Sequence, residues 1–157
     1  MEKILITGGS GFIGTNLIAY LLIKNTYCLL NLDREMPKIT EHQSIWKQVD
    51  LCDKDALKKI VIDFSPEYVI HLAARTDLRG KELKDYDTNM LGVSNLLDVL
   101  ELIPNLKRVI FASSMYVCIP GYMPKSFEDY APHTLYGESK VAVSYTHLRA
   151  HETGRNL

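Results

Sequence analysis

Short apolar runs alternate along the chain with stretches in which apolar side chains recur at helical spacing. Five runs have the length of a strand: residues 3–7, 27–32, 45–49, 68–72 and 107–112. The fourth run is almost wholly apolar, as expected for a parallel strand that is buried on both faces. The alternation of strand and helix predicts an α/β fold of the Rossmann type, a doubly wound parallel sheet with right-handed crossovers and helices on both faces.

The helical stretches have recognisable starts and stops. Apolar residues recur at helical spacing after Gly11, again after Asp53, which is a plausible N-cap, and from about Tyr86 to Leu102. A further helix begins at Tyr136. Residues 35–44 are predicted to be a polar connection, and residues 75–85 a charged loop. Residues 115–135 are proline-rich without clear periodicity, which is typical of a functional loop.

Glycines fill the turn between the first strand and the first helix. The segment from Gly8 to Gly14 fits G-x-G-x-x-G through Gly9, Gly11 and Gly14, and also fits G-x-x-G-x-x-G through Gly8, Gly11 and Gly14. Residues without a Cβ let a pyrophosphate approach the backbone at a helix N-terminus, where free N–H groups favour negative charge. The context of strand, turn and helix therefore predicts a dinucleotide-binding loop.

An acidic residue ends the second strand. Asp33 lies 19 positions after Gly14, close to the spacing of about 20 expected for the acid that binds the adenosine ribose. A carboxylate there favours NAD, since it would repel the 2′-phosphate of NADP. Arg34 leaves NADP open as the less favoured alternative, because an arginine nearby can accommodate that phosphate.

The fourth and fifth strands bring further polar groups to the same edge of the sheet. His71 precedes the small residues Ala73 and Ala74, which would let a cofactor lie against the backbone. A hydrogen-bonded interior histidine is the favoured interpretation of His71 over a catalytic one. The fifth strand delivers Ser113 and Ser114.

A phenol and an ammonium lie one turn apart at the start of the last helix. Tyr136 and Lys140 are four residues apart, so their side chains lie one above the other. A lysine charge stabilises a neighbouring phenolate, and such a tyrosine can exchange a proton during hydride chemistry.

Composition excludes several classes of protein. The 157 residues are 46% hydrophobic with a formal net charge of −1, which fits a globular domain and gives no electrostatic footprint for nucleic acid or a membrane surface. No apolar run reaches the roughly 20 residues of a membrane span, and no secretory signal precedes the first strand. The three cysteines are odd in number and lack metal-site spacing, so a reduced cytoplasmic protein without a metal is expected.

Taken together, these motifs resemble the extended short-chain dehydrogenase/reductase family, and most of all its NAD-dependent epimerases and dehydratases of nucleotide sugars. The resemblance covers residues 1 to about 142. It is carried by Thr7 to Gly14, Asp33, Asp50-Leu51, His71-Leu72-Ala73-Ala74, Asn89, Ser113-Ser114, and Tyr136 with Lys140.

The resemblance implies a role for each matching residue. Tyr136 would be the acid/base on a sugar hydroxyl, Lys140 would hold the nicotinamide ribose, and Ser114 would hydrogen-bond the reacting oxygen, with Ser113 as the close alternative. Asn89 would order the site through its helix. The remaining implied cofactor contacts are Gly8, Gly11, Phe12, Ile13, Gly14, Asp33, Asp50, Leu51, Ala73 and Ala74.

The chain departs from the family in two places. Leu135 stands where a proline often precedes the tyrosine. Beyond Ala142, the family's apolar helix stripe, further strands and C-terminal substrate domain are absent, and residues 143–157 resemble a translated adapter sequence. We therefore expect a partial NAD-binding domain at residues 1–142 and a non-native tail at 143–157. The resemblance also implies that the full-length enzyme forms a homodimer through the helices at 86–102 and after 136.

Three functional hypotheses follow. The first is an enzyme that transfers hydride at a sugar hydroxyl carbon, followed by epimerisation, dehydration or reduction. The second is a dinucleotide sensor without chemistry, which has no need for Tyr136, Lys140 and Ser114 together. The third is an inert fragment of such an enzyme.

Overall fold

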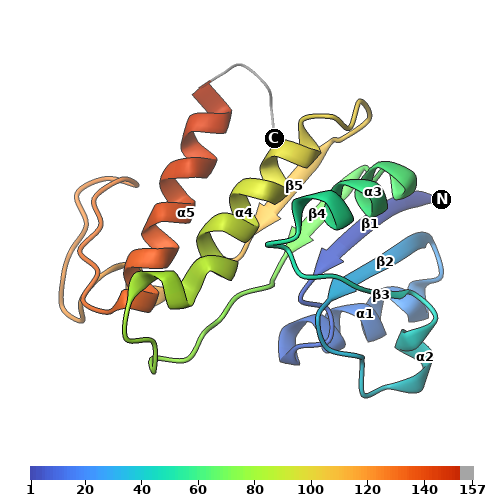
Figure 1. The fold of residues 1–157 in the computed structure, drawn as a ribbon, viewed down its shortest axis with the longest axis horizontal. Coiled ribbons are helices and arrows are strands. Elements are labelled where there is room, and N and C mark those ends of the chain that lie inside the picture. The colour runs from blue at the N-terminus through green and yellow to red at the C-terminus, as the bar shows by residue number, and fades with distance from the viewer. Residues whose placement is uncertain (153–157) are drawn as a thin grey trace.

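A five-stranded parallel sheet forms the centre of the protein (Figure 1). The computed structural model describes the backbone of residues 1–152 and the side chains of residues 1–144. The strand order is β3-β2-β1-β4-β5, which confirms the predicted Rossmann-type sheet. The strands are β1 (Glu2–Thr7), β2 (Tyr27–Asp33), β3 (Trp46–Gln48), β4 (Tyr68–His71) and β5 (Arg108–Phe111).

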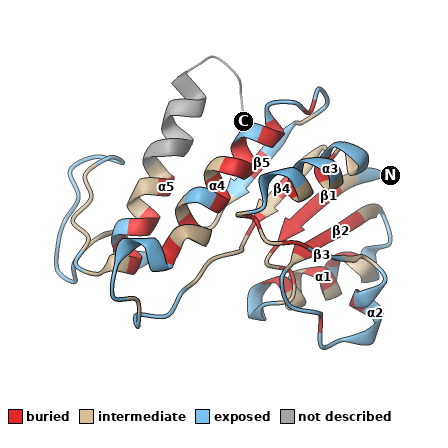
Figure 2. Cartoon of the chain, in the orientation of Figure 1, coloured by how far each residue is buried: buried red, intermediate tan, exposed pale blue. Residues whose placement is uncertain are grey.

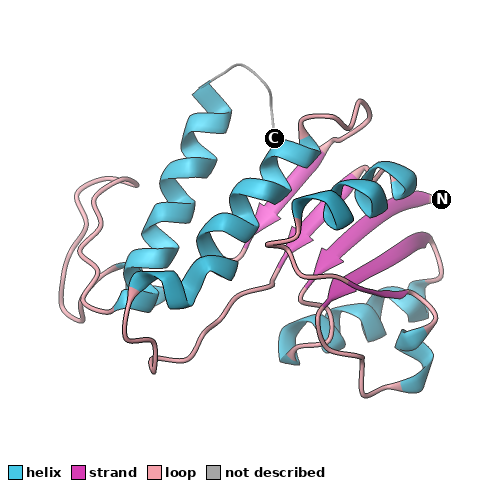
Figure 3. Cartoon of the chain, in the orientation of Figure 1, coloured by secondary structure: helices cyan, strands magenta, loops and turns pink. Residues whose placement is uncertain are grey.

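Helices cover both faces of the sheet, as Figure 3 shows. They are α1 (Phe12–Lys24), α2 (Thr40–Gln43), α3 (Lys54–Phe64), α4 (Asp87–Leu100) and α5 (Leu135–Glu152), with short 3₁₀ turns η1 (Leu83–Tyr86) and η2 (Met115–Val117). Helix α1 packs on one face through Ile18 and Leu21. Helices α3 and α4 pack on the other through Leu57, Val61 and Leu96.

Buried residues concentrate in the central strands and in the helix faces that meet them (Figure 2). Burial decreases across the sheet toward β5. Ile6, Ile70 and Ile110 are register partners on neighbouring strands. Ile6 is fully buried, whereas Ile110 is 53% exposed. Helix α1 therefore shields the middle of this face and leaves the β5 end open.

The N-cap predicted at Asp53 is confirmed, and the connection predicted at residues 35–44 is corrected. Asp53 caps α3, because its carboxylate accepts a hydrogen bond from the backbone N–H of Ala56. The predicted connection at 35–44 contains the short helix α2, whose His42 is buried. The helix predicted to begin at Tyr136 is α5, which begins at Leu135 and continues to Glu152, and Val143 packs against Val93 and Leu97 of α4. The non-native origin of residues 143–157 stays a prediction.

Asn95, a polar residue within the apolar stripe of α4, anchors this helix to a distant part of the chain. Asn95 donates hydrogen bonds from Nδ2 to the carbonyl oxygens of Leu51 and Cys52, at 3.0 and 3.3 Å. It thereby joins α4 to the segment that follows β3.

Within the part of the chain described here, no helix combines the length and apolarity needed to cross a bilayer.

Candidate functional site

The loop after β1 and the exit of β4 are in direct contact at the carboxyl edge of the sheet. Gly8 adopts a φ of +72°, and a Cβ at this position would lie 2.5 Å from the backbone nitrogen of Ala73. Only glycine meets both requirements without strain. The Oγ1 of Thr7 lies 2.8 Å from Nδ1 of His71, and Ala73 N–H donates to the same hydroxyl at 3.4 Å. These contacts hold the two loops together.

His71 is an interior histidine, as the favoured interpretation of the sequence predicted. Its side chain is 1% exposed and packs against the ring of Phe111. Burial, with a smaller contribution from the charge of Lys140, lowers the pKa of His71 to about 3. The ring is therefore neutral at physiological pH and positions Thr7 rather than carrying a charge.

A cavity of about 250 Å³ opens between these loops and the end of β2. Its lining includes six residues that the sequence predicts as cofactor contacts: Gly8, Gly11, Asp33, Leu51, Ala73 and Ala74. The lining also includes Arg34, which the sequence raised as a possible contact for NADP, and five residues that it did not single out: Ser10, Leu32, Glu35, Val49 and Leu72. Each of these five lies within two positions of a predicted contact along the chain.

Asp33 lines this cavity, and both of its carboxylate oxygens accept hydrogen bonds from the backbone. Its Oδ2 accepts a hydrogen bond from the backbone N–H of Ser10 at 2.9 Å, and its Oδ1 accepts one from Glu35 N–H at 3.0 Å. Ser10 Oγ donates in turn to the carbonyl oxygen of Glu35 at 2.7 Å. The glycine loop and the end of β2 are thus joined through the carboxylate that the sequence assigns to ribose binding.

The first turn of α1 is left open at its N-terminus. Gly11 is the N-cap and provides no side-chain hydrogen bond, and the first turn holds no acidic residue. Phe12 and Ile13 are 87% and 63% exposed, whereas Gly14 is buried. Uncapped N–H groups and the helix dipole make this turn suited to an anion such as a pyrophosphate. These three residues flank the cavity rather than line it.

Tyr136 and Lys140 are both buried on α5. Lys140 is 4% exposed and donates from Nζ to the carbonyl oxygen of Ala112 at 2.7 Å, and burial lowers the pKa of its ammonium. Tyr136 is 7% exposed, and its ring lies 6.3 Å from that of Tyr86 and 5.7 Å from that of Tyr116. The pair is therefore fixed against the end of β5 and the loop that follows it.

The two serines after β5 have different surroundings. Ser114 is the N-cap of η2, where its Oγ accepts a hydrogen bond from the backbone N–H of Tyr116 at 3.2 Å. Ser113 lines a separate cavity of about 340 Å³ together with Lys140. On α5, a Cβ on Gly137 would collide with the carbonyl oxygen of Tyr116 in η2. Glycine at this position therefore allows η2 to lie against α5.

Asn89 connects the exit of β4 to α5. Its Oδ1 accepts from Arg75 N–H at 2.8 Å, while its Nδ2 donates to Arg75 O at 3.0 Å and to Ser139 Oγ at 2.9 Å. Ser139 Oγ donates onward to the carbonyl oxygen of Tyr136 at 2.7 Å. The predicted ordering role of Asn89 thus has a physical route through Ser139, which sequence reasoning missed.

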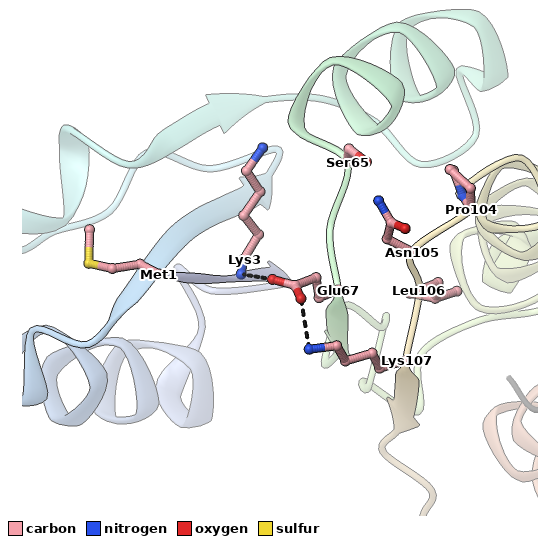
Figure 4. Close-up of a pocket in the computed structure, with 8 residues that line it drawn as sticks. All are labelled: Met1, Lys3, Ser65, Glu67, Pro104, Asn105, Leu106 and Lys107. Carbon is pink, nitrogen blue, oxygen red and sulfur yellow. Dashed lines mark hydrogen bonds and ion pairs between the residues drawn. The ribbon is translucent and has the colours of Figure 1, made fainter.

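A cavity of about 530 Å³ lies at the opposite, amino edge of the sheet (Figure 4). Lys107 Nζ lies 2.8 Å from Oε1 of Glu67, and Oε2 of the same carboxylate accepts a hydrogen bond from the backbone N–H of Lys3 at 3.1 Å. None of the predicted site residues lines it. Ligands of open parallel sheets bind at the carboxyl edge, so we assign the candidate site there.

Among the described residues, no group of three or more His, Cys, Asp or Glu side chains is arranged to hold a metal ion.

Comparison with known proteins gives consistent matches. The model of the NAD dependent epimerase/dehydratase family matches residues 4–157. Protein CapI of Staphylococcus aureus is 31% identical over 169 aligned positions, which cover 93% of this chain and 50% of the relative. A dTDP-glucose 4,6-dehydratase of Haemophilus influenzae is 27% identical over 98% of this chain and 52% of its own length.

Solved structures give the same picture. The UDP-glucose 4-epimerase of Thermotoga maritima, determined with UDP-glucose, superposes with a TM-score of 0.81 at 27% identity, covering 97% of this chain and 52% of the epimerase. The UDP-glucose 4-epimerase of Thermus thermophilus, in complex with NAD, superposes with a TM-score of 0.79 at 26% identity. The match covers 96% of this chain and 51% of that epimerase. The chain spans about half the length of the relatives that it matches.

Proposed function

Because this chain belongs to the NAD dependent epimerase/dehydratase family, we propose that it forms the cofactor-binding part of an enzyme that epimerises or dehydrates a nucleotide sugar. The observation that carries the proposal is the cavity at the carboxyl edge, which joins Gly8, Asp33 and Ala73 from three separate strand ends. Two of the solved relatives contain NAD or UDP-glucose, which supports this cofactor and this substrate class.

The residues around this cavity fit an NAD molecule. Asp33 would accept hydrogen bonds from the adenosine ribose, and Leu51 would contact the adenine beside Asp50. Gly8, Gly11 and Gly14, with Phe12 and Ile13 at the open first turn of α1, would hold the pyrophosphate. Ala73 and Ala74 would let the cofactor run on toward α5. NAD, when bound, supplies a hydride acceptor and donor.

The chemistry is assigned to α5 and the end of β5. Tyr136 would take the proton of a sugar hydroxyl and return it later in the reaction. Lys140 would hold the nicotinamide ribose, with its ammonium already fixed on the carbonyl oxygen of Ala112. Ser114 would donate its O–H to the reacting oxygen while its Oγ continues to accept from Tyr116 N–H.

The proposal extends to the assembly of the complete protein. The nucleotide sugar would bind between this part and residues beyond it, because the relatives are about twice as long. A homodimer would pack α4 and α5 against their mates. Leu91 on α4 is 46% exposed, which is consistent with such a surface.

The sensor and enzyme hypotheses differ in what Tyr136 does. In the full-length protein, Tyr136→Phe removes the hydroxyl and retains the ring that packs on Tyr86 and Tyr116. Turnover of a UDP- or dTDP-sugar is expected to fall about 10²- to 10⁴-fold, the usual contribution of a general acid/base. NAD affinity, measured by calorimetry, is expected to change less than about twofold.

Tyr20→Phe is the matched control, since Tyr20 is 57% exposed on α1 and lies outside the site. It should leave both turnover and NAD affinity unchanged. Unchanged turnover in Tyr136→Phe would contradict the enzyme proposal and leave the sensor. Absence of any NAD binding by the wild-type protein would contradict both.

A further inference from the structure

Arg34 is the one feature of the cavity that conflicts with a preference for NAD. It lines the cavity next to Asp33, where a cation would stabilise the 2′-phosphate of NADP. The surroundings of its guanidinium therefore decide between the two cofactors. This question rests on the proposed function, because it concerns the same nucleotide site.

The guanidinium of Arg34 is directed to Asp50. Its Nη1 lies 3.8 Å from Oδ2 of Asp50, in an ion pair whose side chains are 59% and 45% exposed. The other carboxylate oxygen of Asp50 is already engaged, because Oδ1 accepts from the backbone N–H of Cys52 at 2.9 Å. This bond orients Oδ2 toward Arg34, so the backbone of Cys52 holds the Asp50 carboxylate in the position where it pairs with Arg34.

The backbone on both sides of this pair is also fixed. Gln48 on β3 donates from Nε2 to the carbonyl oxygen of Arg34 at 3.0 Å. Glu35, the next residue, donates its N–H to Asp33 and lines the same cavity. Asp33 and Glu35 line the cavity beside Arg34, and Asp50 pairs with it, so three carboxylates accompany a single guanidinium. The local charge is net negative where a 2′-phosphate would have to bind.

We propose that Asp50 is a cofactor-specificity residue, which holds Arg34 as its counter-ion and thereby prevents Arg34 from recruiting the 2′-phosphate of NADP. Asp33 repels that phosphate directly. Asp50 acts through Arg34 and adds its own negative charge. A sequence with an arginine after the ribose-binding acid can thus still select NAD, provided that a carboxylate after β3 forms an ion pair with the arginine.

The test is the ratio of NADP to NAD association constants, measured by calorimetry on the full chain. Asp50→Asn is the key variant, because its amide oxygen can still accept from Cys52 N–H while the charge is lost. The ratio is expected to rise about three- to tenfold, which corresponds to the strength of an exposed ion pair plus the removal of one nearby negative charge. Salt at about 0.5 M should reduce this gain, since screening weakens exposed charges.

Arg34→Gln supplies the second arm of the experiment. In the wild-type background it should change the ratio little, because Asp50 already occupies the arginine. In the Asp50→Asn background it should abolish the gain. Asp98→Asn is the matched control, because Asp98 forms an exposed ion pair with Lys54 away from the cavity, and its ratio should equal that of the wild type.

Two results would overturn the inference while leaving the proposed function standing: NAD binding with an unchanged ratio in Asp50→Asn, or an equal loss of NADP affinity from Arg34→Gln in both backgrounds. The second would mean that Arg34 is free to bind the phosphate in the native protein. A wild-type chain that binds neither dinucleotide would overturn the proposed function and this inference together.

Discussion

At the scale of single residues, the site is built from side chains whose protonation and contacts are set by burial. Lys140 and His71 are both almost inaccessible, and burial lowers the pKa of each. His71 nevertheless retains a specific partner in the hydroxyl of Thr7. A neutral imidazole can hold that hydroxyl without placing a second positive charge beside Lys140.

The buried state of His71 predicts a pH dependence of stability. The native ring takes up a proton only near pH 3, whereas the ring in the unfolded chain does so near 6.5. Between these values the unfolded state binds more protons, so stability is lost as the pH falls from about 6.5 toward about 3. Urea unfolding at pH 5 and pH 7 should show this loss, with a slope of at most about 1.4 kcal/mol per pH unit from this group.

The variant His71→Asn cannot titrate in this range and should flatten that slope. His133→Asn serves as the control, because His133 is exposed and its replacement should leave the slope as in the wild type. A slope that is identical in the wild type and in His71→Asn would show that the native state does not lower the pKa of His71.

At the scale of elements, helix α4 connects the two ends of the proposed site. Asn89 lies in its first turn and reaches Arg75 and Ser139, whereas Asn95 lies further along and reaches Leu51 and Cys52. One asparagine therefore contacts α5, where the chemistry is proposed, and the other contacts the segment proposed to bind the adenosine. Both are buried, so each hydrogen bond replaces one that water would otherwise make.

This arrangement predicts that the two asparagines have separable functions. Asn89→Ala and Asn95→Ala should each reduce the free energy of unfolding by about 1–3 kcal/mol, because buried partners are left unsatisfied. In the full-length protein, Asn89→Ala should lower kcat, since Ser139 and the start of α5 lose their anchor. Asn95→Ala should mainly weaken NAD binding through Leu51.

Urea unfolding, calorimetry with NAD and steady-state turnover measure the three quantities, and each variant is the control for the other. Equal effects of both substitutions on kcat and on NAD affinity would show that α4 acts only as a general support.

At the scale of the whole molecule, the sheet is covered unevenly. The α3 and α4 face is closed by a large apolar cluster, whereas the α1 face is open toward β5. Ile110 is half exposed there, and the outer edge of β5 pairs with no strand among the described residues. The loop after β5 adds Met123 and Phe127, which are 85% and 95% exposed. Exposed apolar surface of this kind and an unpaired strand edge favour association.

The isolated chain is therefore expected to self-associate and to melt without sharp cooperativity. Sedimentation velocity over a range of concentrations should show association, and Ile110→Thr should reduce it while keeping a residue that suits a strand. Ile23→Thr is the control, because Ile23 is also exposed but lies on α1 and not on β5. A monomer at all concentrations with a two-state thermal transition would contradict this expectation.

The sequence by itself determined the order of the strands and the edge of the sheet at which the candidate site lies. Nearly continuous apolar runs identified the five strands, and the glycines after β1 and the acid at the end of β2 identified Gly8, Gly11 and Asp33 among the residues that line the cavity. These signals are local, because a turn without Cβ atoms or a buried parallel strand requires particular residues at neighbouring positions.

Only the tertiary structure decided the contacts between distant positions. Arg34 meets Asp50, Tyr86 packs on Tyr136, and Asn89 reaches Ser139 because the sheet order and the packing of α4 on α5 bring these residues together. The apparent breaks at Asn89 and Asn95 likewise became anchors. No local pattern encodes such pairs, since each depends on the distance between two elements rather than on the residues beside it in the chain.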